Sequence, residues 1–194
     1  WLVLTRDIFP KAMNQNSIAF AYAVAKVNGL DLFRNHIEVV DFGGGEQPYI
    51  SVHGLVALAE IAGEFGGWGK ETHGPVKQFK IGSQSITAPE WVQTDVYKII
   101  RMNNKDERVL CNGPMVFFDE EVRVKKDKDP NNFWLTRPRS MLSKNSRRRT
   151  ILANFQSLAK RKNADDVDDG GQFTASVTNE NVIDLSYSDQ QVDP

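Results

Sequence analysis

Apolar residues recur at helical spacing in two stretches of the first third of the chain. The pattern over residues 17–27 predicts a helix, with Asn16 or Ser17 as its N-cap and Gly29 as its end. Residues 54–65 show the same spacing and predict a second helix. Because most positions of the first helix are apolar, we expect it to be largely buried.

Alternating apolar and polar residues predict strands in the intervening and following segments. Residues 36–42 and 48–52 are separated by three glycines, and together they predict a β-hairpin. A glycine-rich stretch at residues 66–69 predicts a loop that exposes Trp68. The runs beyond this loop are joined by short, turn-rich links, which favours one antiparallel sheet. These runs cover residues 76–81, 91–102, 108–111 and 115–124.

A last helix is predicted to begin at Thr136 or Arg137 and to extend to about Ala159. Pro138 falls in its first turn, where a missing backbone N–H is tolerated. The helix is basic, and its apolar stripe comprises Met141, Leu142, Leu152, Phe155 and Ala159.

Three consecutive arginines interrupt this stripe. Successive helical residues turn by about 100°, so Arg147, Arg148 and Arg149 cannot share one face. We predict that Arg148 points toward the protein, because it lies four residues before Leu152. A buried guanidinium needs a partner, which would be an acid, a neighbouring subunit or a phosphate. The alternative is that all three arginines are solvated and that the helix bends or ends there.

These patterns predict an α+β fold with an antiparallel sheet and a β-hairpin, flanked by helices that include a basic C-terminal helix. The 194 residues, 40% of them apolar, suffice for one globular domain with a core. We place this domain at residues 1–162.

The net charge of −1 conceals an uneven distribution of charge. Residues 137–162 contain nine Lys or Arg and no acid, which is typical of a surface that faces a polyanion. Residues 163–194 contain eight acids and no base, so residues 1–162 carry 24 bases against 17 acids, about +7. The polar, acidic composition of residues 163–194 predicts a disordered tail. Such a tail could screen the basic surface, recruit a partner or increase solubility.

Several classes of protein are disfavoured by what the sequence lacks. With no long apolar run and no signal peptide, we expect neither membrane insertion nor secretion. The single cysteine, Cys111, suits a reducing cytoplasm and reads as a small core residue. No phosphate-binding loop motif and no metal-ligand spacing of His or Cys occurs, so we expect no cofactor and no metal.

Three blocks of the chain carry motifs that belong together. Residues 21–42 contain a helix that ends in Lys-Val-Asn-Gly-Leu-Asp and leads into a strand. Residues 48–59 begin Pro-Tyr-Ile-Ser-Val-His-Gly and combine a hairpin strand with the start of a helix. The third block, residues 134–154, contains Trp134, Pro138, Arg139, Met141, Leu142 and Lys144. In their motifs, order and separation, the three blocks resemble the RecT/Red-beta superfamily of phage single-strand DNA annealing proteins.

Two positions depart from the family's pattern. Leu32 replaces the usual proline of the turn, and Asn35 stands where some relatives have a basic hairpin residue. Arg34, directly before Asn35, could take over that DNA contact.

The resemblance implies a non-catalytic protein that coats single-stranded DNA without ATP and anneals it to a complementary strand. It also implies assembly into rings or helical filaments in the cytoplasm of a bacterial host. Candidate partners besides single-stranded DNA and the annealed duplex are a phage exonuclease and the host single-strand binding protein.

Cations suit this task because contacts to phosphate leave the base edges free for pairing. Each candidate cation could instead be an ordinary solvated charge. The aromatic residues Phe133 and Trp134, which border the basic segment, are expected in the core. The residues that we assign to DNA binding are Arg34, Lys98, Arg101, Arg123, Lys125, Lys126, Arg137, Arg139, Lys144, Arg147, Arg148 and Arg149.

Two other functions remain as alternatives at this point. One is a phage structural or scaffolding protein whose basic helix docks an acidic partner. The other is a Mg²⁺-dependent nuclease that uses Asp95 with Asp119, Glu120 and Glu121. Adjacent carboxylates on a strand would point to opposite sides, which argues against a shared metal ion.

Overall fold

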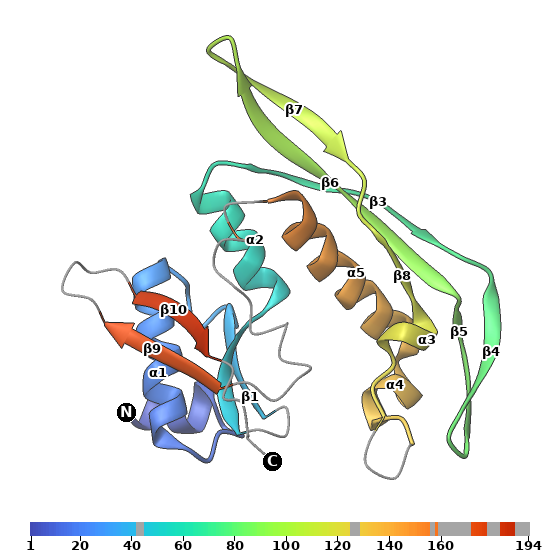
Figure 1. Cartoon of the computed structure of the whole chain (residues 1–194), viewed down its shortest axis with the longest axis horizontal. Coiled ribbons are helices and arrows are strands. Elements are labelled where there is room, and N and C mark those ends of the chain that lie inside the picture. Colours follow the sequence, from blue (N-terminus) through green and yellow to red (C-terminus); the bar gives the residue numbers. More distant parts are fainter. Residues whose placement is uncertain (42–44, 125–128, 156–157, 159–171, 178–182, 189–194) are drawn as a thin grey trace. The chain divides into compact units, whose positions relative to one another are not determined.

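The computed structural model describes residues 1–41, 45–124, 129–155, 158, 172–177 and 183–188 (Figure 1). The chain divides into two compact units. Unit 1 combines residues 1–59 with residues 157–194, and unit 2 comprises residues 60–156. Each unit is described separately below.

The described part of unit 1 contains a π-helical turn, two α-helices and two pairs of antiparallel strands. A π-helical turn at Leu4–Ile8 precedes helix α1 (Gln15–Asn28), the hairpin β1 (Ile37–Asp41) and β2 (Glu46–Ile50), and helix α2 (Val52–Ile61), whose last residues enter unit 2. Strands β9 (Gln172–Val177) and β10 (Ile183–Ser188) form the second pair. The predicted hairpin is thus confirmed, with Ile37 opposite Ile50.

Helix α1 begins two residues before the predicted start. The side chain of Asn14 caps it by accepting a hydrogen bond from Asn16 N (2.9 Å), so the predicted cap at Asn16 or Ser17 is wrong. The backbone of Asn14 is extended, as a cap requires, whereas Ser17 is buried inside the helix and donates its hydroxyl to Glu46 O (2.9 Å). Gly29 ends the helix in the left-handed conformation, as predicted (φ 66°).

Unit 2 is built on an antiparallel sheet of four strands. Strand β6 (Trp91–Met102) lies between β3 (Phe65–His73) and β7 (Lys105–Cys111), and it also pairs with β8 (Met115–Phe117). A separate hairpin joins β4 (Val76–Ile81) and β5 (Gln84–Pro89). The helices are α3 (Phe118–Glu121), α4 (Asn132–Thr136) and α5 (Pro138–Asn154), and α5 packs along β6 (Figure 1). The predicted α+β class is confirmed.

Several segments of unit 2 differ from the prediction. The helix predicted over residues 54–65 ends at Ile61, and Phe65 begins β3. Strand β4 pairs with β5 alone and is not part of the one antiparallel sheet that was predicted. The glycines of residues 66–69 form part of β3 and not a loop, with register shifts on either side of Trp68. A Cβ on Gly69 would lie 2.8 Å from the Cβ of Asp95, so glycine lets β3 approach its neighbour closely. The run over residues 115–124 is a strand only as far as Phe117, after which α3 begins.

The core of unit 2 gathers side chains from the sheet, the β4–β5 hairpin and three helices. Trp134 is only 2% exposed and meets the ring of Phe118 edge-on, with centroids 5.6 Å apart. Phe133, also expected in the core, is exposed. Cys111, expected as a core residue, is half-buried at the end of β7. The buried cluster consists of Ile86, Ala88, Val92, Val116, Phe118, Trp134 and Leu142.

The boundary that we predict at residue 162 stays a prediction, as does the disordered tail. Within residues 163–194 the structure describes only β9 and β10, which pair with each other. Among the described residues, no helix combines the length and the apolar character needed to cross a membrane.

Candidate nucleic-acid interface

Helix α5 docks on the sheet through small hydroxyl side chains. Its buried stripe runs from Leu142 through Ser146 to Thr150. The hydroxyl of Ser146 lies 2.9 Å from the hydroxyl of Thr94 on β6, and Thr150 donates its hydroxyl to Thr94 O (2.8 Å). The stripe therefore bypasses Arg148, which is half-buried between two exposed arginines. The helix also ends at Asn154, short of the predicted end at Ala159.

One arginine of α5 is paired with an acid of β3. Glu71 accepts hydrogen bonds from the hydroxyl of Ser143 (2.9 Å) and from Nε of Arg147 (3.2 Å). Its carboxylate also lies 3.1 Å from Nη2 of Arg147 and 3.1 Å from Nε2 of His73. Nη2 of Arg139 lies 3.3 Å from the same histidine nitrogen. Glu71 thus occupies the centre of a group of hydrogen-bond donors, much as a phosphate would.

A second acid holds α5 from the side of α3. Glu121 is mostly buried. It accepts a hydrogen bond from Nδ2 of Asn145 (2.7 Å) and forms an ion pair with Arg149. Since Arg147 and Arg149 are two residues apart on the helix, they point in nearly opposite directions. Acids from β3 and α3 therefore neutralise part of the charge of α5 on both of its flanks.

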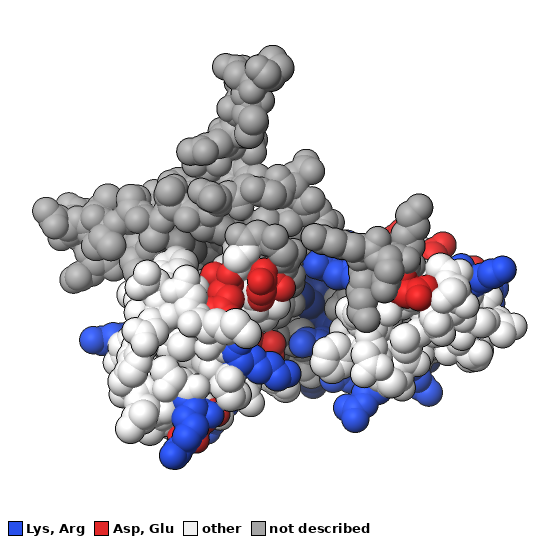
Figure 2. Space-filling model, turned by 90° about the horizontal axis from the view of Figure 1, so that it is seen from below, with Lys and Arg blue, Asp and Glu red and all other residues white. Residues whose placement is uncertain are grey.

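Other cations of this helix region remain on the surface. Arg137 and Lys144 are exposed, and among the described residues neither has an ion pair with an acid. Figure 2 shows Lys and Arg in several separate groups on the face that it draws, with Asp and Glu beside some of them. In this helix region acids thus offset the charges of Arg147 and Arg149, whereas Arg137 and Lys144 are exposed.

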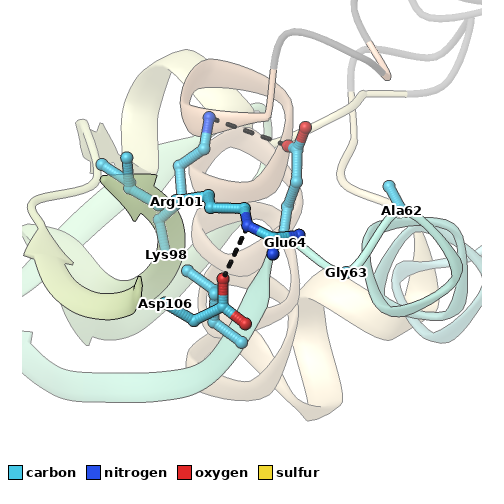
Figure 3. A pocket seen from close by; sticks show the side chains of 8 residues that line it. Ala62, Gly63, Glu64, Lys98, Arg101 and Asp106 are labelled. Carbon is cyan, nitrogen blue, oxygen red and sulfur yellow. Dashed lines mark ion pairs between the residues drawn. The ribbon is translucent and has the colours of Figure 1, made fainter. Parts of the chain in front are cut away.

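Two further candidate cations line one pocket of about 530 Å³ at the start of β3 (Figure 3). Lys98 donates from Nζ to Asn154 O (3.1 Å) and lies 3.7 Å from Glu64. Its charge therefore stabilises the carbonyl end of α5. Nε of Arg101 lies 4.0 Å from Asp106, and both side chains are mostly exposed.

The remaining candidates do not join either group. Arg34 belongs to unit 1, where its Nε lies 3.5 Å from Asp31. Arg123 is exposed and follows α3, and its carbonyl accepts a hydrogen bond from Asn131 N (3.3 Å). The two candidates Lys125 and Lys126 lie outside the described residues.

Trp68, expected on an exposed loop, is half-buried in β3. Its ring packs edge-on against Phe65, with centroids 5.7 Å apart, and the guanidinium of Arg147 lies 5.7 Å from its centroid. Trp68 therefore makes a cation–π contact with Arg147, the same arginine that forms the ion pair with Glu71.

The acids that restrain α5 were not anticipated from the sequence. Glu71 lies in the strand that was predicted as a loop up to residue 69, and Glu121 lies in a helix that was predicted as a strand. Correct secondary structure would have placed Glu71 opposite Thr94, and therefore under α5. The register between β3 and β6, which the sequence does not give, is therefore what would have identified Glu71 as a partner of α5.

The carboxylates that a nuclease would need do not converge. Val92, Thr94 and Val96 are the buried positions of β6, so Asp95 faces the opposite side of the sheet from α5. Glu121 contacts α5 itself. Among the described residues, no three His, Cys, Asp or Glu side chains are grouped as metal ligands.

The fold and this basic helix define a mixed α+β protein with a hairpin, a central antiparallel sheet and a cationic C-terminal helix. The RecT family matches residues 1–178, and the chain belongs to this family. Its members are phage proteins that bind single-stranded DNA, anneal it in recombination and oligomerise. No significant match to the chain is found among the curated proteins or the solved structures.

Proposed function

We propose that the chain binds single-stranded DNA along the outward side of α5 and anneals it to a complementary strand without ATP. The residues proposed to contact phosphate there are Arg137, Arg139, Lys144, Arg147 and Arg149, with Lys98 and Arg101 as a second group. The observation that carries this proposal is the orientation of α5. Its buried stripe consists of hydroxyl and apolar residues, and its cations Arg139, Lys144, Arg147 and Arg149 are exposed, whereas Arg148 is half-buried.

The ion pairs of α5 are compatible with DNA binding. The side chains of Arg147 and Arg149 are about half exposed, whereas their partners Glu71 and Glu121 are mostly buried. A phosphate can therefore reach both guanidinium groups from the solvent and compete there with the carboxylates. Because several phosphates bind at once, the release of counterions would favour the DNA complex at low salt.

Contacts to phosphate also suit the annealing step. They neutralise the repulsion between two strands and leave the base edges free to find their complement. We propose that subunits assemble into a ring or a helical filament, so that their basic helices form one continuous groove. The proposed setting is the cytoplasm of a bacterial host, with a phage exonuclease and the host single-strand binding protein as partners.

The test is a titration of a labelled oligonucleotide across a series of salt concentrations, followed by an annealing assay without ATP. Log K is expected to fall linearly with log salt at about −0.7 per phosphate neutralised. Annealing of complementary strands should proceed without nucleotide. Binding that does not respond to salt, or oligonucleotide shortening in Mg²⁺, would contradict the proposal.

A further inference from the structure

A second arginine–aromatic contact lies on the face of the sheet that is turned away from α5. Tyr97 of β6 faces this side, because the buried residues Val92, Thr94 and Val96 face the other. The guanidinium carbon of Arg108 on β7 lies 3.7 Å from the centroid of the Tyr97 ring. At this distance the guanidinium stacks directly on the aromatic face.

Arg108 is also tied to the neighbouring strand. Its Nε donates to Gly66 O on β3 (2.9 Å), so the side chain crosses β6 and lies flat over it. One end of the guanidinium fork is thereby occupied by a backbone carbonyl. The hydrogen bond and the stack together fix the orientation of the guanidinium plane.

The glycines at the start of β3 leave room for this arrangement. A Cβ on Gly66 would lie 3.1 Å from the Cβ of Tyr97, and a Cβ on Gly67 would lie 3.4 Å from Nη2 of Arg108. Gly67 also has φ +103°, a conformation that favours glycine. The Gly-Gly-Trp-Gly motif therefore allows the stack to form, in addition to the close approach of the strands.

Arg108 differs from Arg147 and Arg149 of α5 because its guanidinium has no carboxylate partner among the described residues. The residue is exposed although Tyr97 covers one face of its guanidinium, so the other face is open to solvent. Among the described residues, its guanidinium contacts a ring and a carbonyl and no carboxylate. It therefore keeps its full charge on a fixed, flat and accessible surface. Leu110, opposite Tyr97 in the register, adds an exposed apolar side chain on the same face.

We propose that Arg108, stacked on Tyr97, is a platform on which a base of single-stranded DNA stacks. This inference rests on the proposed function and adds a second contact on the other face of the sheet. A guanidinium plane and a base attract each other through their faces, so the base edge that pairs with the complement stays free. Phosphate is the less suitable ligand, because the bond from Nε to Gly66 O excludes the side-on bidentate contact through Nε and Nη2.

The test compares two fluorescent oligonucleotides of equal length, one of deoxythymidine and one of abasic residues, by anisotropy with the full chain. The wild-type chain should bind the oligonucleotide with bases more tightly, by about tenfold for one stacked base. Arg108→Ala should abolish most of this preference. Arg108→Lys should abolish it too, yet leave the affinity for the abasic strand near that of the wild type, since the charge is kept.

Lys105→Ala provides the matched control, since Lys105 is an exposed cation on the same strand. It should weaken both complexes equally. The inference is overturned if Arg108→Lys keeps the wild-type preference for bases, whether or not Arg108→Ala keeps it too. If Arg108→Ala does not fold, as judged by circular dichroism, Arg108→Lys decides. A wild-type chain that binds neither oligonucleotide would overturn the proposed function as well.

Discussion

The two faces of the β3–β6–β7 sheet use arginine in different ways. On the face covered by α5, Arg147 lies 5.7 Å from the centroid of Trp68 and is paired with Glu71. On the opposite face, Arg108 lies 3.7 Å from the centroid of Tyr97 and is held by a carbonyl. In the first arrangement a carboxylate partly neutralises the guanidinium, and a phosphate would have to compete with that carboxylate. In the second arrangement the guanidinium keeps its full charge and a fixed plane. Arginine content alone therefore does not describe a nucleic-acid surface.

The faces also differ in what anchors them. The α5 face depends on close packing between hydroxyl groups, whereas the opposite face depends on glycines that keep the surface flat. Substitutions can separate these two requirements. The expected effects below are given from the largest to the smallest.

Gly113→Ala should break the docking of α5. The added Cβ would lie 2.0 Å from Oγ1 of Thr150 and 2.1 Å from Thr94 O, and a backbone atom cannot move aside easily. We expect a loss of about 3 kcal/mol in the free energy of unfolding, measured by denaturant titration. Gly63→Ala is the control without a clash, because its Cβ meets nothing within 4 Å. Its φ of +71° disfavours a side chain, so we expect this variant to lose about 1 kcal/mol. Equal losses in both variants would contradict the close packing of α5.

Thr94→Val should cost about 1–2 kcal/mol of unfolding free energy, because it leaves the buried hydroxyl of Ser146 without its partner. The double variant Thr94→Val with Ser146→Ala should lose less than the sum of the two single variants. Additive losses would show that the two hydroxyls do not interact.

Arg139→Ala combined with Lys144→Ala should weaken the binding of single-stranded DNA at low salt and slow annealing. Removing two phosphate contacts should reduce the slope of log K against log salt by about 1.4. The circular dichroism spectrum should stay unchanged, since both residues are exposed. A loss of helical content would instead mean that these residues are structural.

Glu71→Gln should have the smallest effect and the opposite sign. Removing the carboxylate charge releases Arg147 from its ion pair, which should raise the affinity for single-stranded DNA by about threefold. Glu90→Gln, which breaks a similar pair with Lys77 on β4, should leave the affinity unchanged. Weaker binding by the Glu71 variant would mean that this acid positions Arg147 and does not compete with DNA.

The sequence predicted the features that depend on local pattern. Alternation and helical spacing predicted β1, β2, β4, β6 and the two long helices, and Gly29 and Pro138 fall where their backbone preferences require. The glycine strand was missed because Gly-Gly-Trp-Gly is a loop signal unless a neighbouring chain needs the space. The stripe of α5 was misplaced because Ser146 and Thr150 are polar, and only the partner hydroxyl and carbonyl of Thr94 make them suitable for burial.

The candidate site was predictable only as a set of cations. Their partners come from distant elements: Glu71 from β3, Glu121 from α3, and the carbonyl of Asn154 for Lys98. Arg108 was overlooked because it lies outside the basic segment, and its importance depends on a cross-strand register. Which charges are neutralised is a property of the fold and not of the composition.

Footprinting of lysines by acetylation and mass spectrometry tests most directly whether DNA lies along α5. Lys144 is exposed on α5, and Lys80 is exposed on β4 between Phe79 and Ile81, which pack against the core. Saturating single-stranded DNA should protect Lys144 from acetylation and leave Lys80 reactive. Equal reactivity of Lys144 with and without bound DNA would contradict the account.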